Sequence, residues 1–294
     1  MMPPRPRAGE GAAVTLDTKG ALRLGMEDVW YRRGGAVILR GVNWQARSGE
    51  HWAVLGPNGS GKTTLMMIAT GYLPWSRGRV FLLDGYLGEI VTPQARAEVG
   101  LVSAALTEFM LRFREGRLTG LKVALSGRYG SLGVYQRPSA KDIAQAKAAL
   151  KRLGVARLQD ALFETMSAGE KQLCLIARCY MAESRLIVLD EPCSGLDLAA
   201  RERLLESLSR SCRERPETPH ILVTHHPEEI VPEIENVLLI SKGRVAAQGP
   251  RSRVLTRERL EAAYETPLRV VREGGRVWIL PRRDAARSRP RAMF

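Results

Sequence analysis

Eight consecutive residues from Gly56 to Thr63 carry the strongest chemical signal in the sequence. They read Gly-Pro-Asn-Gly-Ser-Gly-Lys-Thr and fit the pattern G-x-x-x-x-G-K-[ST]. Glycines in such a loop let backbone N–H groups curl round phosphate oxygens, and a helix after the loop points its positive end at the same anion. Lys62 can reach the outer phosphates of a nucleotide, and the Thr63 hydroxyl can bind Mg²⁺.

The surroundings of this loop favour a phosphate site over a glycine-rich turn that binds nothing. An apolar strand pattern precedes the loop and a helical pattern follows it, which is the context that such a site requires. The predicted binding residues are therefore Gly56, Pro57, Asn58, Gly59, Ser60, Gly61, Lys62, Thr63 and Thr64.

Two adjacent acids end the continuous apolar run Leu186–Leu189. In a parallel sheet, the carboxyl ends of the strands face the ligand crevice. Asp190 is then placed to hold Mg²⁺ through its water shell, and Glu191 to orient and polarise an attacking water. The alternative is that both acids simply end a strand and stay solvated. Their position after a phosphate loop favours the functional interpretation.

Three further segments follow in a recognisable order. Met166–Gln172 reads Met-Ser-Ala-Gly-Glu-Lys-Gln, Ser194–Asp197 reads Ser-Gly-Leu-Asp, and Thr224 precedes His225. Together with the loop and the two acids, this order resembles the ATP-binding cassette ATPases, specifically the nucleotide-binding subunit of ABC transporters. The resemblance covers roughly residues 26–254, and five motifs in one order are far more specific than any one of them.

The resemblance implies roles for individual residues. Ser167 and Gly169 look like the signature motif, which contacts the γ-phosphate of ATP held by a second subunit. Ser167 also suits a helix N-cap, and both roles can hold at once. Asp197 looks like the acid that crosses the dimer interface, and His225 looks like the switch histidine that hydrogen-bonds the γ-phosphate. The implied catalytic residues are Glu191, His225 and Lys62, and the implied metal ligands are Thr63 and Asp190.

The sequence departs from the family pattern in two places. The first is the signature, which reads Ser-Ala-Gly-Glu-Lys-Gln rather than Ser-Gly-Gly-Gln. The second is Ala104, which stands where these cassettes usually carry a glutamine that binds Mg²⁺ and couples the core to its membrane partner. Tyr31 is the best candidate for the aromatic side chain that stacks on adenine, although Arg33 lies nearer the commonest offset. The stretches His51–Leu55 and Thr70–Pro74 are similar to a molybdate-type group of stand-alone cassettes.

The elements that must position these residues indicate an α/β fold. Apolar strand patterns alternate with helical ones, as expected of a mainly parallel sheet. The resemblance implies a phosphate-loop NTPase fold with an N-terminal antiparallel β layer and a helical subdomain. The strands expected in the sheet are His51–Leu55, Leu186–Leu189, Ile221–Val223 and Val237–Ile240. Arg32–Gly35 is expected to turn a hairpin between Leu24–Tyr31 and Ala36–Leu39, with a separate short strand at Val42–Gln45.

We expect four regions along the chain. Residues 1–23 form a disordered tail, and residues 24–256 the ATPase domain, with the helical subdomain inserted at about 105–180. Residues 257–281 are a C-terminal extension with a β-hairpin, and residues 282–294 are a basic tail. The net charge is +14, and about half of the excess lies in residues 1–25 and 257–294.

Composition narrows the function without naming a substrate. The sequence contains no run of 18 apolar residues that could cross a membrane and no CxxC pair for a zinc knuckle. We expect a cytoplasmic ATPase that binds ATP and Mg²⁺, pairs head-to-tail with a second copy and works at the inner face of the membrane through separate permease subunits. Phe109–Phe113 is a candidate permease contact.

Two other functions stay open at this point. The first is a soluble cassette ATPase that acts on nucleic acid or ribosomes, which the basic charge allows but the short spacing between the motifs does not favour. The second is a binding module that does not hydrolyse ATP, against which the intact Asp190, Glu191 and His225 argue.

Overall fold

The central element of the protein is a six-stranded sheet. The computed structural model describes residues 22–103, 118–129 and 137–282 of the chain. The strand order is β10-β9-β3-β8-β7-β6, in which β10 alone runs antiparallel to its neighbour. The mainly parallel sheet expected from the sequence is therefore confirmed. The strands are β3 (Trp52–Leu55), β6 (Val99–Val102), β7 (Leu186–Asp190), β8 (His220–Thr224), β9 (Asn236–Ser241) and β10 (Arg244–Pro250).

A separate antiparallel sheet forms the N-terminal layer that the resemblance implied. Its order is β2-β1-β4-β5, built from β1 (Leu22–Arg33), β2 (Ala36–Arg47), β4 (Arg77–Leu82) and β5 (Gly85–Tyr86). The expected hairpin is present, because Arg33 pairs with Ala36 across the turn. The separate strand predicted at Val42–Gln45 is wrong. Gly41 adopts a φ of +61° within β2, and the strand continues past this bend because its pairing with β1 resumes at Val42.

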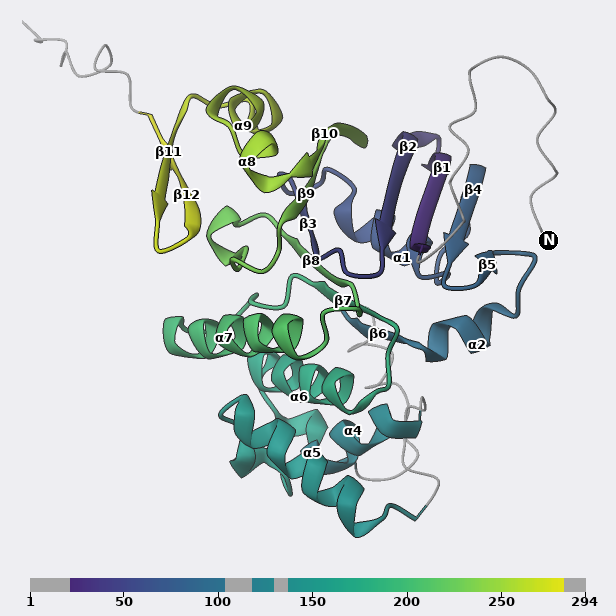
Figure 1. Cartoon of the computed structure of the whole chain (residues 1–294), viewed down its shortest axis with the longest axis vertical. Coiled ribbons are helices and arrows are strands. Elements are labelled where there is room, and N and C mark those ends of the chain that lie inside the picture. The colour runs from purple at the N-terminus through teal and green to yellow at the C-terminus, as the bar shows by residue number, and fades with distance from the viewer. Residues whose placement is uncertain (1–21, 104–117, 130–136, 283–294) are drawn as a thin grey trace, which may run out of the picture.

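The helices gather mainly on one side of the six-stranded sheet, with α4, α5 and α6 at the bottom of Figure 1. None of the helices in the described part of the chain is both long enough and apolar enough to cross a membrane. Ala104, the candidate contact Phe109–Phe113 and residues 1–21 and 283–294 of the expected tails lie outside the described residues. The expected end of the N-terminal tail at residue 23 is wrong by two residues, because Leu22 and Arg23 are already part of β1. The helices are α1 (Lys62–Ala69), α2 (Thr92–Ala97), α4 (Gly120–Ser126), α5 (Ala140–Arg152), α6 (Ala168–Met181), α7 (Leu198–Glu214), α8 (Arg251–Val254) and α9 (Arg257–Tyr264).

The two faces of the six-stranded sheet bury two different hydrophobic cores. Successive side chains of a strand point to opposite faces. On β7, Ile187 and Leu189 therefore enter the core shared with the helices, whereas Leu186 and Val188 enter the core shared with the antiparallel sheet and α1. Both faces are covered, which explains why β3, β7 and β8 read as uninterrupted apolar runs.

The C-terminal segment packs onto this framework as well. β11 (Leu268–Glu273) and β12 (Arg276–Pro281) pair as an antiparallel hairpin beside α8 and α9, at the upper left of Figure 1. Leu268 and Val277 are buried in the core on the helical side of the large sheet. Arg276 on β12 forms an ion pair of 2.8 Å with Glu202 on α7. The hairpin is thus attached to the cassette by apolar and charged contacts.

Two histidines tie the amino ends of β3 and β8 to α7. The His51 Nδ1 atom accepts a hydrogen bond of 3.2 Å from the backbone N–H of His220, and the His51 ring lies close to Cys212 of α7. The His220 ring bonds to the Thr218 carbonyl at 2.8 Å and to the Ser211 hydroxyl at 2.9 Å. His51, Cys212 and His220 are close enough to hold a metal ion. Three of the four ring nitrogens already have a hydrogen-bond partner and His220 is fully buried, so we assign the cluster a structural role.

These buried histidines should make folding stability depend on pH. Burial, with a smaller contribution from His51, lowers the pKa of His220 from 6.5 to about 3, so the unfolded chain binds a proton that the folded one excludes. The contribution of His220 to the free energy of unfolding is therefore fully present above pH 6.5. It decreases as the pH falls below 6.5, by up to about 1.4 kcal/mol for each pH unit.

Chemical denaturation at several pH values, from about 7.5 to about 5, measures this loss against His220→Asn, which cannot titrate. The wild-type protein should lose more stability than the variant as the pH falls. Parallel pH profiles for the two proteins would contradict the prediction.

Candidate active site

The phosphate loop between β3 and α1 is held close to the carboxyl end of β9, the neighbour of β3 in the large sheet. Gly56 has a φ of +157°, and a Cβ atom at this position would lie 2.0 Å from the carbonyl oxygen of Ile240 on β9. Only glycine allows the loop to pass β9 at this distance. The loop is fastened further along, where the backbone N–H of Gly243 bonds to the Ser60 carbonyl at 3.1 Å.

Lys62 lies at the first position of α1 and points back into the loop. Its ammonium group donates hydrogen bonds of 2.9 Å to the Gly56 carbonyl and 3.1 Å to the Pro57 carbonyl. The same nitrogen lies 3.7 Å from Glu191 Oε1, and the side chain is 6% exposed. Burial lowers the pKa of Lys62, while Glu191 and Asp190 oppose that effect. The site therefore holds a desolvated positive charge between carbonyls and a carboxylate.

Thr63 and Asp190 form an oxygen-rich pair beside this lysine. The Thr63 hydroxyl donates a hydrogen bond of 3.3 Å to Asp190 Oδ1. Asp190 is the last residue of β7 and is 6% exposed. Burial raises the pKa of Asp190 to about 6, although the Thr63 bond and the charge of Lys62 act in the opposite direction.

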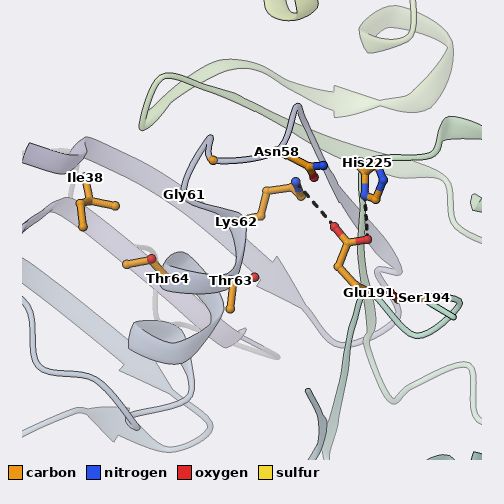
Figure 2. A pocket seen from close by; sticks show the side chains of 10 residues that line it. Ile38, Asn58, Gly61, Lys62, Thr63, Thr64, Glu191, Ser194 and His225 are labelled. Atoms are coloured by element: carbon orange, nitrogen blue, oxygen red, sulfur yellow. Dashed lines mark hydrogen bonds and ion pairs between the residues drawn. The ribbon is translucent and has the colours of Figure 1, made fainter. Parts of the chain in front are cut away.

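Glu191 connects the phosphate loop to His225, which follows β8, the strand between β3 and β7. Its φ of +51° is rare for a residue with a side chain and follows directly on the end of the strand. Its Oε2 atom lies 2.8 Å from His225 Nδ1, just beyond the end of β8. Figure 2 shows Glu191 between Lys62 and His225, with one carboxylate oxygen toward each. A strained backbone thus aims one acid at two nitrogen groups.

Lys62, Thr63, Glu191 and His225 border one open cavity of about 420 Å³, and Asp190 contacts Thr63 without lining the cavity. It lies where β3, β7 and β8 end, which is where ligands bind in sheets of this kind. The residues that line it are Ile38, Asn58, Gly59, Gly61, Lys62, Thr63, Thr64, Glu191, Ser194 and His225.

Sequence reasoning did not include two of the lining residues among the site residues. Ile38 reaches the cavity from β2. The Arg40 N–H on β2 bonds to the Gly243 carbonyl at 2.8 Å, and Gly243 is itself bonded to the Ser60 carbonyl of the phosphate loop, so β2 is held beside the loop. Ser194 lay within a recognised segment, so its proximity to the acids was a usable signal.

The predicted adenine contact and the loop serine do not line the cavity. Tyr31 is half-buried and packs against the hydrophobic core beneath the antiparallel sheet. Ser60 is 3% exposed, and its backbone N–H turns toward the Pro57 carbonyl at 3.2 Å.

The residues of the signature resemblance also lie apart from the cavity. Ser167 caps α6, where its hydroxyl accepts from the Glu170 N–H at 3.2 Å and the Glu170 carboxylate accepts from the Ser167 N–H at 2.9 Å. Gly169 follows in the first turn, against Leu196. Asp197 caps α7 by accepting from the Ala200 N–H at 2.7 Å. Each helix start therefore has one N–H group capped by a side chain, and neither Ser167 nor Gly169 borders the cavity of its own chain.

Comparison with known proteins matches this geometry to one family. The sequence pattern of the ABC transporter family matches residues 39–194. The chain is 37% identical to the uncharacterised ABC transporter ATP-binding protein YlmA of Bacillus subtilis over 250 residues, which cover 84% of this chain and 93% of YlmA.

A second relative bears on the subgroup. The chain is 35% identical over 196 residues to the ABC transporter ATP-binding protein ModF of Escherichia coli, a match that covers 65% of this chain and 39% of ModF. This match is in line with the molybdate-type resemblance noted in the sequence.

The fold is also found in solved cassettes. A structure of cbiO1 from Clostridium perfringens, part of the ABC transporter complex cbiONQ, superposes with a TM-score of 0.63 at 26% identity and covers 82% of this chain and 94% of that one. The phosphate loop, the two acids and the histidine thus sit in a known framework. The chain belongs to the ABC transporter family, as one of its ATP-binding cassette ATPases.

Proposed function

We propose that this cavity hydrolyses ATP and that the energy drives a separate membrane permease. The observation that carries the proposal is the arrangement of Lys62, Glu191 and His225 beside the phosphate loop. Glu191 Oε1 lies 3.7 Å from Lys62 Nζ, and Glu191 Oε2 lies 2.8 Å from His225 Nδ1. A cation, a carboxylate and an imidazole so arranged can bind the phosphates, orient a water and stabilise the charge that develops on transfer.

In this mechanism each side chain has one task. Glu191 orients a water in line with the γ-phosphorus and draws off its proton as the bond to ADP breaks. Lys62 and His225 stabilise the negative charge on the γ-phosphate oxygens in the transition state. The backbone of Gly56–Thr64 cradles the phosphates, and α1 directs its positive end toward them.

Thr63 and Asp190 fit a magnesium site. Their oxygens are 3.3 Å apart, near the separation of about 3 Å that adjacent ligands have in octahedral coordination at the usual Mg–O distance. A hydroxyl and a carboxylate are also the donors that this hard cation prefers. Bound Mg²⁺ would neutralise charge on the β- and γ-phosphate oxygens.

A second copy of the chain would complete the site. Ser167 and Gly169 lie at the start of a 14-residue helix whose first N–H groups suit an anion, yet they do not border the cavity of their own chain. We therefore propose that two chains close head-to-tail on two ATP molecules, with α6 of each chain facing the phosphate loop of the other. Leu198, beside Asp197, is 67% exposed and would be covered in such a dimer.

The permease is proposed on the names of the relatives. YlmA and ModF are named ATP-binding proteins of ABC transporters, and cbiO1 is described as part of a transporter complex. A chain that works with such a partner would sit at the inner face of the membrane. The names of other relatives include manganese and zinc transport systems and hemin import.

Replacing Lys62 tests the phosphate site. Lys62→Ala removes a buried charge that would contact the phosphates, so ATP affinity should fall about tenfold or more. Titration with a fluorescent ATP analogue measures the change, and Lys151→Ala, at an exposed position of α5, serves as the matched control. Unchanged affinity of Lys62→Ala would overturn the assignment of the phosphate loop.

Replacing Glu191 separates binding from hydrolysis. Glu191→Gln keeps the size of the side chain but cannot accept the proton, so turnover should fall about 10²- to 10⁴-fold while ATP still binds. The variant should elute as a dimer in size-exclusion chromatography with ATP and Mg²⁺, and Glu206→Gln, exposed on α7, should behave like the wild type. Normal turnover of Glu191→Gln would show that Glu191 is not the catalytic base.

The nature of the partner can be tested directly. The proposal predicts that a multi-spanning permease is encoded beside this chain and that its addition, reconstituted in lipid, raises the ATPase rate. Stimulation by nucleic acid instead, lost steeply with added salt, would favour the rival function.

A further inference from the structure

The loop that carries His225 is held from two directions. On the side of the cavity, Glu191 binds the imidazole at 2.8 Å. On the other side, the hydroxyl of Tyr264 donates a hydrogen bond of 3.1 Å to the backbone carbonyl of His225. Tyr264 lies 39 residues further along the chain, at the end of α9. The histidine is therefore fixed between the catalytic centre and the C-terminal segment.

The rest of this loop is fastened by its own residues. The Thr224 hydroxyl donates to the buried carboxylate of Glu229 at 2.5 Å and accepts from the His226 N–H at 3.0 Å. The Glu229 N–H returns to the His226 carbonyl at 3.1 Å. The His226 N–H and the His225 carbonyl belong to one planar peptide unit, so Thr224 holds its N–H and Tyr264 holds its carbonyl. Tyr264 thus supplies a restraint that comes from another element.

Tyr264 can act as a fixed point because α9 is well anchored. Leu260 and Ala263 of α9 are buried in the main core, against which the Tyr264 ring packs. The Ser241 hydroxyl at the end of β9 donates to the Ala263 carbonyl at 3.2 Å, and Lys242 pairs with Glu265 just beyond the helix. The helix is therefore tied to the same sheet that carries the phosphate loop.

We propose that Tyr264 is a positioning residue for hydrolysis: its hydroxyl sets the place of the His225 peptide and thereby aims the imidazole at the γ-phosphate. This inference rests on the proposed function of His225. It connects the segment from α9 to β12 with the catalytic site. A displacement of α9 would move His225 through the hydrogen bond between the Tyr264 hydroxyl and the His225 carbonyl.

The chemistry of the tyrosine suits this task. Burial raises the pKa of Tyr264, and the carboxylates of Glu228 and Glu191 add to the effect. The hydroxyl therefore stays protonated around neutral pH and can donate its hydrogen bond to the His225 carbonyl.

Tyr264→Phe tests the proposal, because it removes the hydroxyl and keeps the ring in the core. Loss of one hydrogen bond should lower kcat about three- to tenfold. KM for ATP and the ATP dissociation constant should change less than about twofold, because the bond acts on a group that works in the transition state. The matched control is Tyr180→Phe, whose hydroxyl bonds to Ser207 at 3.1 Å in the helical part of the protein. It should leave kcat unchanged.

A double-mutant cycle separates positioning from general loosening. In a His225→Ala background, measured in single-turnover experiments with excess enzyme, Tyr264→Phe should cause no further loss of rate. An equal loss in both backgrounds would overturn the inference and assign Tyr264 a structural role. An unchanged kcat of Tyr264→Phe would also overturn it.

Nuclear magnetic resonance gives a readout independent of activity. The chain has four histidines. Tyr264→Phe should shift the imidazole signals of His225, identified by their loss in His225→Ala, while those of His51 and His220 stay in place. Unmoved His225 signals would count against the proposal. The proposed function has its own failure: if Glu191→Gln hydrolyses ATP normally, the catalytic scheme falls whatever Tyr264→Phe does.

Discussion

The architecture of this cassette depends on one buried charge. Lys62 is almost fully enclosed, and a desolvated ammonium is costly unless polar groups surround it. The Gly56 and Pro57 carbonyls and the Glu191 carboxylate provide that environment, and they come from the loop after β3 and from the end of β7. The lysine therefore fixes the distance between two strand ends that are separated by β8 in the sheet.

The framework around this charge leaves little freedom. The parallel strands are covered on both faces, so a shift of one residue would exchange the side chains of the two cores. The phosphate loop passes β9 so closely that Gly56 has no room for a side chain. Asp190 and Glu191 follow one another in sequence but face different groups, Thr63 and His225, because the backbone turns sharply at Glu191. The two adjacent acids therefore make different contacts, Asp190 with Thr63 and Glu191 with His225.

The C-terminal segment brings a second, longer connection to the same site. α9 packs on the main core and reaches the His225 peptide, and the hairpin β11–β12 reaches α7 through Arg276. α7 begins at Leu198, directly after its N-cap Asp197 and a few residues after Glu191. The segment therefore contacts elements on two sides of the catalytic centre. The C-terminal segment is thus connected to the nucleotide site through two contacts, that of Tyr264 with His225 and that of Arg276 with Glu202.

The sequence by itself determined the family, the mainly parallel sheet and most of the cavity. Residues 56–64 and the adjacent pair Asp190–Glu191 are local patterns whose spacing already expresses their chemistry, and the apolar runs of β7 and β8 reflect burial on both faces. Only the tertiary structure decided which distant groups meet. Tyr31 and Ile38 pack against the same core, but only Ile38 lines the cavity, because its part of β2 lies beside Gly61 of the phosphate loop. The contact between Tyr264 and His225 joins residues whose separation in the chain carries no periodic signal, so no local pattern could have predicted it.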